Sequence, residues 1–250
     1  MRFNAPWGGE FLGKMPAMSA VESLTQTGYA FLPPAEVTAE LRVDLGQLDA
    51  LKEYWSALPR DEYLRDGGRY RSRRHSCFTQ ENGVLTLAPH RAHWQPTAYN
   101  ALHGGLERWF EPIAPEILQN PVWTQLVQSI GTVFTRVRPA VKRWYIEAHQ
   151  FRIDTSDGIG RPTPEGAHRD GVDFVALLLV QRRNVRGGET RVFDAHGPSG
   201  VRFTMEQPWS LLLMDDERVI HETTPIQPDG EGGVRDTLVL TYRAGGFQAP

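Results

Sequence analysis

Short runs of apolar residues, separated by glycine and proline, dominate the second half of the chain. The runs are rich in β-branched, aromatic and leucine residues, a composition typical of β-strands. We predict strands at Trp144–Ile153, Val172–Gln181, Glu189–Asp194, Val201–Met205, Trp209–Met214, Arg218–His221 and Thr237–Arg243. Regularly spaced short strands indicate a β-sandwich or a barrel. The glycine pair within Arg186–Glu189 predicts a hairpin between two of them.

One predicted strand is apolar at every position. Phe174–Val180 contains no polar residue, so both of its faces should be buried. We expect it to lie between the barrel interior and a covering layer. The first half of the chain supplies that layer, because its apolar residues recur at helical spacing.

Two helices are best marked in the first half. One is expected between Asp44 and Pro59, with an apolar face formed by Leu48, Leu51, Trp55 and Leu58. The other should be capped by Asn120, begin at Pro121 and end near Arg138, before Pro139. We therefore predict a single domain over residues 1–250, mainly β with flanking helices (α+β). A helical cover plus edge strands would occupy about residues 1–140, and the β-core about 144–243.

The composition excludes several classes of function. The chain has 250 residues, of which 23% are charged, and a formal net charge of −3. A slightly acidic chain has no overall attraction for nucleic acid or anionic membrane. Its longest apolar run is also too short to span a bilayer. The single cysteine, Cys77, excludes a multi-thiolate metal site. The N-terminal segment has no apolar core of the kind found in a secretory signal. Together with the single cysteine, this favours a cytoplasmic protein.

The segment Pro164–Gly171 contains a pattern that suits a metal site. His168 and Asp170 are two residues apart, so on an extended chain both side chains point to the same side. His221, at the end of a later strand, is the candidate for a third ligand. Two histidines and one carboxylate on one face of a metal are typical of non-haem Fe(II) oxygenases. A His-x-Asp pair alone is more often two solvated loop residues.

The last predicted strand carries a second part of the pattern. Alternation places Arg235 and Thr237 on one face, and Leu238, Leu240 and Tyr242 on the other. A guanidinium that points inward needs an anion. A dicarboxylate cosubstrate would supply one.

These motifs resemble those of the Fe(II)/2-oxoglutarate-dependent oxygenases. His168-x-Asp170, His221 and Arg235-x-Thr237 follow one another in the order of that family. The sequence around these motifs resembles the bacterial branch of the family that includes free L-isoleucine and related aliphatic amino-acid hydroxylases. The similar segments are Thr163–Gly166, His168–Phe174, Arg183–Glu189 and Asp215–Ile226. The resemblance is strong over about residues 150–242 and weaker over 100–113.

The resemblance implies a double-stranded β-helix (a jelly-roll, cupin-like core) in which His168, Asp170 and His221 hold Fe(II). It implies that 2-oxoglutarate chelates the metal, with its C5 carboxylate paired to Arg235 and hydrogen-bonded by Thr237. With O2 as the other cosubstrate, a small free amino acid would be hydroxylated or sulfoxidised, and succinate and CO2 released. The protein itself would supply positioning and a dry cavity.

An amino-acid substrate needs a cation for its carboxylate and an acceptor for its ammonium. Alternation places Gln150 and Arg152 on one face and Phe151 on the other. If Phe151 faces the outer layer, the other two point into the barrel. We then expect Arg152 to bind the carboxylate, Gln150 to assist it, and Glu165 to accept the ammonium. Equally open is that Arg152 and Glu165 pair with each other or lie in solvent.

The other charged and histidine residues are expected to be structural. A basic strip should form a solvated face or an arginine-bearing lid over the active site. It comprises Arg65, Arg69, Arg71, Arg73 and Arg74. Four histidines without ligand spacing are expected at the surface or hydrogen-bonded in the core, namely His75, His90, His93 and His103. His149, on the face opposite Gln150, is not an expected ligand. Cys77 should be a small buried apolar residue.

Two other functions fit a metal-binding barrel. A cupin-type enzyme that does not use 2-oxoglutarate has no need of Arg235-x-Thr237. A non-catalytic barrel that serves as a sensor or interaction module would tend to lose its ligands. We expect a small-molecule partner and no nucleic-acid partner. Because two-fold dimers are the commonest oligomers, a homodimer through the helical half is the oligomer to test.

Overall fold

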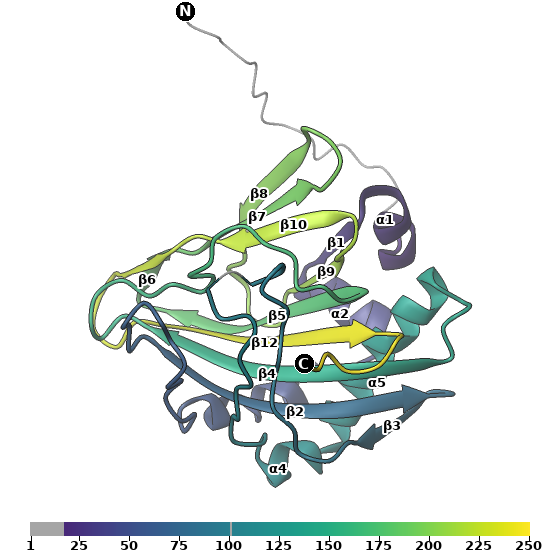
Figure 1. Ribbon diagram of the computed structural model, residues 1–250, viewed down its shortest axis with the longest axis horizontal. Helices are drawn as coiled ribbons and strands as arrows, with labels where there is room; N and C mark the ends of the chain where they lie inside the picture. Colours follow the sequence, from purple (N-terminus) through teal and green to yellow (C-terminus); the bar gives the residue numbers. More distant parts are fainter. Residues whose placement is uncertain (1–17, 101) are drawn as a thin grey trace, which may run out of the picture.

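The largest element of the protein is a seven-stranded antiparallel sheet (Figure 1). The structure, a computed structural model, describes residues 18–100 and 102–250, so the first 17 residues of the predicted cover, including the segment that bore on localisation, lie outside it. In spatial order the strands are β1 (Tyr29–Leu32), β9 (Leu211–Asp215), β5 (Phe174–Arg183), β12 (Val234–Arg243), β4 (Arg143–Asp154), β2 (Arg71–Glu81) and β3 (Val84–Leu87).

A smaller sheet packs on one face of this sheet through apolar side chains of both. Its strands are β10 (Val219–Thr223), β7 (Glu189–Asp194) and β8 (Gly200–Thr204), and a short ribbon is formed by β11 (Ile226–Pro228) and β6 (Val185–Gly187). Two antiparallel sheets packed in this way form a jelly-roll core. The prediction of a mainly β fold with flanking helices is therefore confirmed.

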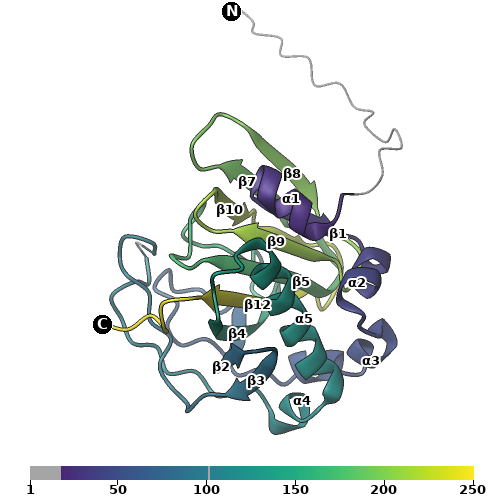
Figure 2. The ribbon, with the colours of Figure 1, turned by 90° about the vertical axis from the view of Figure 1, so that its right-hand side faces the viewer.

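The helices cover the opposite face of the large sheet, as Figure 2 shows. They are α1 (Ala20–Thr27), α2 (Pro34–Leu41), α3 (Leu45–Asp49), the 3₁₀-helix η1 (Lys52–Trp55), α4 (Pro115–Leu118) and α5 (Pro121–Val137). Helix α5 forms as predicted. Asn120 Oδ1 accepts the main-chain N–H of Val122 at 3.0 Å, and Pro121 occupies the first helical position.

Strand β5 separates two cores, as its apolar sequence predicts. Phe174, Ala176, Leu178 and Val180 pack against the helices. The alternate residues Val175, Leu177 and Leu179 pack towards the smaller sheet. Burial of both faces fixes the strand at the centre of the fold.

Two local predictions are wrong. The helix expected between Asp44 and Pro59 is divided into α3 and η1, although its four apolar residues are buried. The expected hairpin at Arg186–Glu189 does not form, because β6 pairs with β11 and β7 pairs with β10 and β8. Gly187 and Gly188 have φ values of 79° and 70°, which allow the chain to pass between two sheets.

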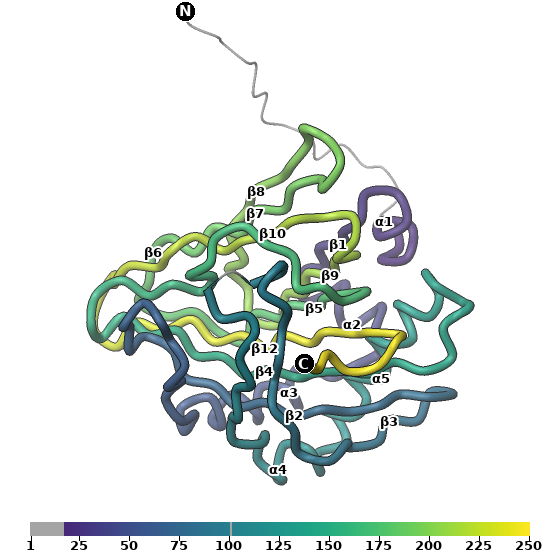
Figure 3. Tube along the Cα trace, in the orientation of Figure 1, coloured from purple at the N-terminus to yellow at the C-terminus, as the bar shows by residue number. Residues whose placement is uncertain are grey.

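Strand β2 was not predicted, and its sequence explains why. Its eleven residues include three arginines and a histidine, and such residues rarely form a central strand. Figure 3 shows the chain between β3 and α4 crossing the open face of the large sheet, near β2, β4 and β12. We call residues 88–100 and 102–110 the covering segment. In the described residues, no helix is long and apolar enough to cross a membrane.

Candidate active site

His168 and His221 lie opposite each other on two antiparallel segments. The main-chain N–H of each donates to the carbonyl oxygen of the other at 3.0 Å. Opposite residues of an antiparallel pair point to the same side. Both rings accordingly line one pocket, with their centroids 4.6 Å apart. Main-chain pairing therefore sets the separation of the two imidazoles.

Asp170 completes a cluster of three ligand side chains. Its oxygens lie 3.9 Å from His168 Nε2 and 3.7 Å from His221 Nε2. Ligand atoms of the three residues all lie within 4.8 Å of one another. Asp216 fixes the turn, because its carboxylate accepts the main-chain N–H groups of residues 170–172 at 2.8 to 3.1 Å.

The hydrogen bond of His168 and the burial of His221 bear on how the two rings can bind a metal. His168 Nδ1 lies 2.9 Å from the carbonyl oxygen of Gly166. Because a carbonyl can only accept, Nδ1 carries the proton and Nε2 is free to ligate. Burial, reinforced by the neighbouring His168 ring, lowers the pKa of His221 well below its ordinary value. For His168 burial is outweighed by the carboxylates of Asp170 and Glu165, which raise its pKa, so a metal that binds Nε2 would have to displace a proton from the protonated ring. Two imidazoles and a carboxylate are a ligand set that fits Fe(II).

Arg235 and Thr237 line the same pocket from β12, and Leu238, Leu240 and Tyr242 lie in the core beneath the helices, as alternation predicts. Arg235 is 2% exposed. Within the described residues, its Nε and Nη2 have no hydrogen-bond partner. Burial lowers the pKa of Arg235 to about 10, so the side chain is still charged at neutral pH. A buried cation with two free donors on a pocket wall suits a carboxylate.

Glu165 is the predicted substrate residue that lies in the pocket. Its Oε1 is 3.5 Å from His168 Nε2. Its Oε2 is buried and has no hydrogen-bond partner in the described part of the chain. This oxygen is available to a donor on a bound molecule, and its assignment to an ammonium group stays a prediction.

Gln150 and Arg152 do not line the pocket, contrary to the prediction. Arg152 Nε and Nη2 donate to the two carboxylate oxygens of Asp236 at 2.8 and 2.7 Å. The alternative prediction, an ion pair between Arg152 and Glu165, is also wrong, because Arg152 is bound to Asp236. Gln150 is buried on the same face of β4 as Arg152. The pocket is lined instead by the alternate residues Glu147, His149, Phe151 and Ile153.

The error lies in the direction assumed for Phe151. Phe151 pairs with Thr237 of β12 and so faces the pocket, not the helical layer. Its ring centroid lies 4.4 Å from the Arg73 guanidinium carbon. An aromatic ring that serves as a platform for a cation cannot be distinguished by sequence from one that packs in a core.

Three arginines form one side of the pocket, which we call the arginine wall. Two of them belong to the strip expected to be a solvated face or a lid over the active site, and the third, Arg108, was not predicted. Arg71 and Arg73 come from β2, and Arg108 from the covering segment. All three are buried, so a solvated face is the wrong interpretation for Arg71 and Arg73. Arg74 lies on the other face of β2 and pairs with Glu111. Arg71 and Arg73 are two residues apart, so on a strand their side chains share one face. This spacing would have indicated a common site if β2 had been predicted as a strand.

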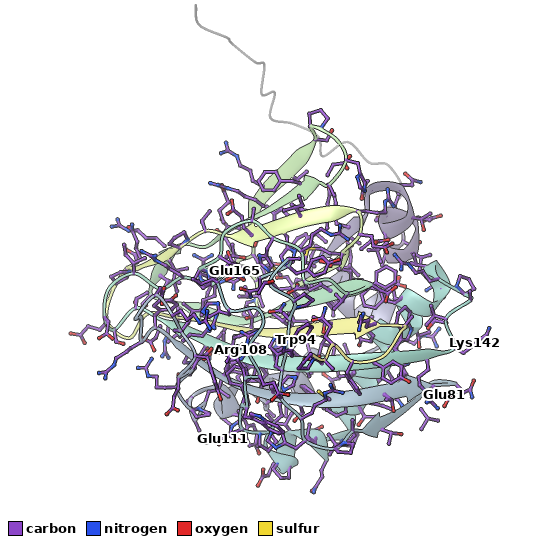
Figure 4. All side chains as sticks on the ribbon, viewed as in Figure 1. Glu81, Trp94, Arg108, Glu111, Lys142 and Glu165 are labelled. Carbon is purple, nitrogen blue, oxygen red and sulfur yellow. The ribbon has the colours of Figure 1, made fainter. Side chains whose placement is uncertain are left out.

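Arg108 and Glu165 can be located in the view with all side chains. Figure 4 shows Arg108 and Glu165 in the central part of the view, whereas Glu81 and Lys142 lie at its edge. Arg108 and Glu165 both line the pocket. A cation and a carboxylate from separate segments thus contribute to one cavity.

A second group of four potential ligands, His75, His93, Glu147 and His149, is also buried. Glu147 Oε2 lies 2.9 Å from His75 Nε2 and 2.7 Å from His93 Nδ1. Arg73 Nη2 lies 2.7 Å from His149 Nδ1. Because a guanidinium can only donate, Nδ1 holds a lone pair and the proton of a neutral His149 is on Nε2. We interpret the group as a carboxylate bonded by histidine N–H groups, which agrees with the hydrogen-bonded role predicted for His75 and His93.

Comparison with known proteins identifies a family. The profile of the family described as 2OG-Fe dioxygenase matches residues 52–241. No curated protein matches the chain.

Solved structures of similar proteins share the fold. A bsmA homolog from Methylobium petroleophilum PM1 is 56% identical, with a TM-score of 0.88 over 92% of this chain and 94% of the other. IDO from Bacillus thuringiensis is 20% identical, with a TM-score of 0.74 over 90% and 97%. The Fe(II)/(alpha)ketoglutarate-dependent dioxygenase TqaL is 19% identical, with a TM-score of 0.67 over 89% and 85%.

Proposed function

Because the chain belongs to the 2OG-Fe dioxygenase family, whose members use Fe(II), 2-oxoglutarate and O2, we propose that it hydroxylates or sulfoxidises a small free amino acid. The observation that carries the amino-acid part is the charge of the pocket. Buried arginines and the free carboxylate oxygen of Glu165 line one cavity. Groups of both signs suit a zwitterion, whereas an uncharged substrate would leave both without partners.

The pocket residues fit the cofactors of the family. His168, Asp170 and His221 would hold the iron, and Arg235 with Thr237 would bind the distal carboxylate of 2-oxoglutarate. Bound iron and 2-oxoglutarate together supply the activation of O2 and the oxidation of an aliphatic carbon or a thioether.

The chain itself contributes orientation and a water-poor surface. Val175, Leu177 and Val239 line the pocket with aliphatic groups, which exclude water from the reacting atoms. The main-chain pair of His168 and His221 holds two ligands at fixed separation. Free donors on Arg235 orient a carboxylate before any reaction takes place.

One experiment tests the enzyme and its substrate class separately. Fe(II) and 2-oxoglutarate added under nitrogen should give a weak visible charge-transfer band, and His168→Ala should abolish it. Oxygen and a panel of amino acids should then release succinate. A band without amino-acid-stimulated succinate would overturn the substrate class. The absence of the band would overturn the assigned cofactor site.

The alternative of a cupin-type enzyme that uses no 2-oxoglutarate is less well supported. It gives no role to the buried cation Arg235, whose Nε and Nη2 have no partner among residues 18–100 and 102–250. A non-catalytic barrel is likewise less well supported, because family membership and an assembled ligand cluster agree. A cytoplasmic location and a homodimer stay predictions.

A further inference from the structure

The arginine wall keeps free N–H donors, although the carboxylates of Glu147 and Glu165, as well as Asp61, lie close enough to favour its charged form. Asp61 is the carboxylate that it shares, 2.7 Å from Arg71 Nε and 3.8 Å from Arg73 Nη1. In the described part of the chain, Arg71 Nη2, Arg73 Nε and Arg108 Nε are buried and have no hydrogen-bond partner. Unpartnered charged donors are costly in a buried site unless an anion meets them.

Neighbouring side chains fix the wall in position. The guanidinium carbon of Arg73 lies 3.8 Å from the ring centroid of Phe110 and 4.4 Å from that of Phe151. Its Nη2 is held by His149 and its Nη1 lies near Asp61, so Nε is the nitrogen left to donate to a carboxylate. Arg108 Nη2 donates to Gln95 Oε1 at 3.0 Å. Such a site needs little rearrangement to bind.

The wall is separate from the Arg235 site. Arg71 of β2 lies opposite Ile153 of β4, and Ile153 lies opposite Arg235 of β12. Adjacent strands are about 4.8 Å apart, so the backbones at Arg71 and Arg235 are separated by roughly 10 Å. Two cationic groups at this distance suit two different anions.

We propose that Arg71, Arg73 and Arg108 form a second anion subsite, which binds the carboxylate of the substrate. This inference rests on the proposed function, because it concerns the amino acid and not 2-oxoglutarate. The subsite replaces Arg152, whose guanidinium is bound to Asp236. With Glu165 in the same pocket, a zwitterion would meet both charges.

Gln95 connects this subsite to the metal ligands. Its Oε1 accepts from Arg108 Nη2 at 3.0 Å and from Asn100 Nδ2 at 3.1 Å, and its Nε2 donates to Asp170 Oδ1 at 3.1 Å. Because Arg108 can only donate, the amide has one orientation. A carboxylate bound at Arg108 is therefore one side chain away from Asp170.

The test compares an amino acid with its uncharged amide. Probes are L-isoleucine, L-leucine and L-methionine and their amides, titrated under nitrogen into the chain loaded with Fe(II) and 2-oxoglutarate. Wild type should bind at least one acid about 10- to 100-fold more tightly than its amide. Arg73→Met and Arg108→Met should remove that preference. Arg74→Met, one residue along β2 on the opposite face, should keep it.

Equal affinity for acid and amide in wild type would overturn the subsite, as would an unchanged preference in Arg73→Met and Arg108→Met. The charge-transfer band of iron and 2-oxoglutarate should persist in both variants, so that failure of the subsite is distinguished from failure of the proposed function. Thermal unfolding shows whether Arg73→Met folds, and Arg108→Met provides an independent test.

A probe that needs no substrate completes the test. Crystals soaked in sodium bromide should show anomalous density beside the free nitrogens of Arg71, Arg73 and Arg108. If none of the amino acids binds and no bromide occupies this position, the subsite is overturned.

Discussion

The metal-ligand side of the pocket and the arginine wall are held in place by different means. His168 and His221 are opposed by reciprocal main-chain hydrogen bonds. Arg73 depends instead on the ring of Phe110, and Arg108 on the amide of Gln95, both in the covering segment. The two metal-ligating histidines are therefore placed by main-chain pairing, whereas the arginine wall depends on the packing of the covering segment. Substitutions in that segment should change specificity before they change metal binding.

The largest effect should come from the metal-ligand side. Asp170→Ala removes the carboxylate of the cluster, so we expect loss of stoichiometric Mn(II) or Fe(II) binding in anaerobic titration. Asp194→Asn, in strand β7, is the matched control and should bind one equivalent. Full metal binding by Asp170→Ala would contradict the assignment.

A large loss of stability, rather than of substrate affinity, should follow Arg152→Met. This variant leaves the fully buried carboxylate of Asp236 without its cation, which should cost about 3 kcal/mol in the free energy of unfolding. Denaturant unfolding measures this. In Arg152→Met/Asp236→Leu most of the loss should be recovered. A stable Arg152→Met with greatly weakened substrate binding would restore the original assignment.

Arg235→Met should weaken the binding of 2-oxoglutarate and leave metal binding unchanged. A buried cation that pairs with a carboxylate contributes enough that we expect 2-oxoglutarate affinity to fall at least about 30-fold, while Mn(II) binding is retained. Arg202→Met, on the exposed strand β8, is the control. If Arg235→Met bound 2-oxoglutarate as wild type does, the dicarboxylate site would lie elsewhere.

The smallest effect is expected at the second histidine group. His75→Gln should still bind one metal per chain, because His75 and His93 bond to the carboxylate of Glu147 and need no metal between them. Metal analysis of wild type and His75→Gln after Co(II) loading measures the stoichiometry. Two equivalents in wild type and one in the variant would show instead that this group binds metal.

The sequence allowed the local parts of the site to be predicted. His168 and Asp170 are two residues apart, and Arg235 and Thr237 share one face of a strand whose other face is plainly apolar. On β4 both faces are mixed, so the direction of Arg152 could not be read from alternation. Arg108 reaches the pocket only because the covering segment folds across the sheet, and no local pattern encodes such a path.

The reciprocal hydrogen bonds between His168 and His221 have a consequence for demetallation. Main-chain hydrogen bonds between the two segments need no metal, so we expect chelation to leave a folded protein that can bind the metal again. The amide hydrogens of these two residues should exchange with deuterated solvent equally slowly in the metal-free and the metal-loaded forms.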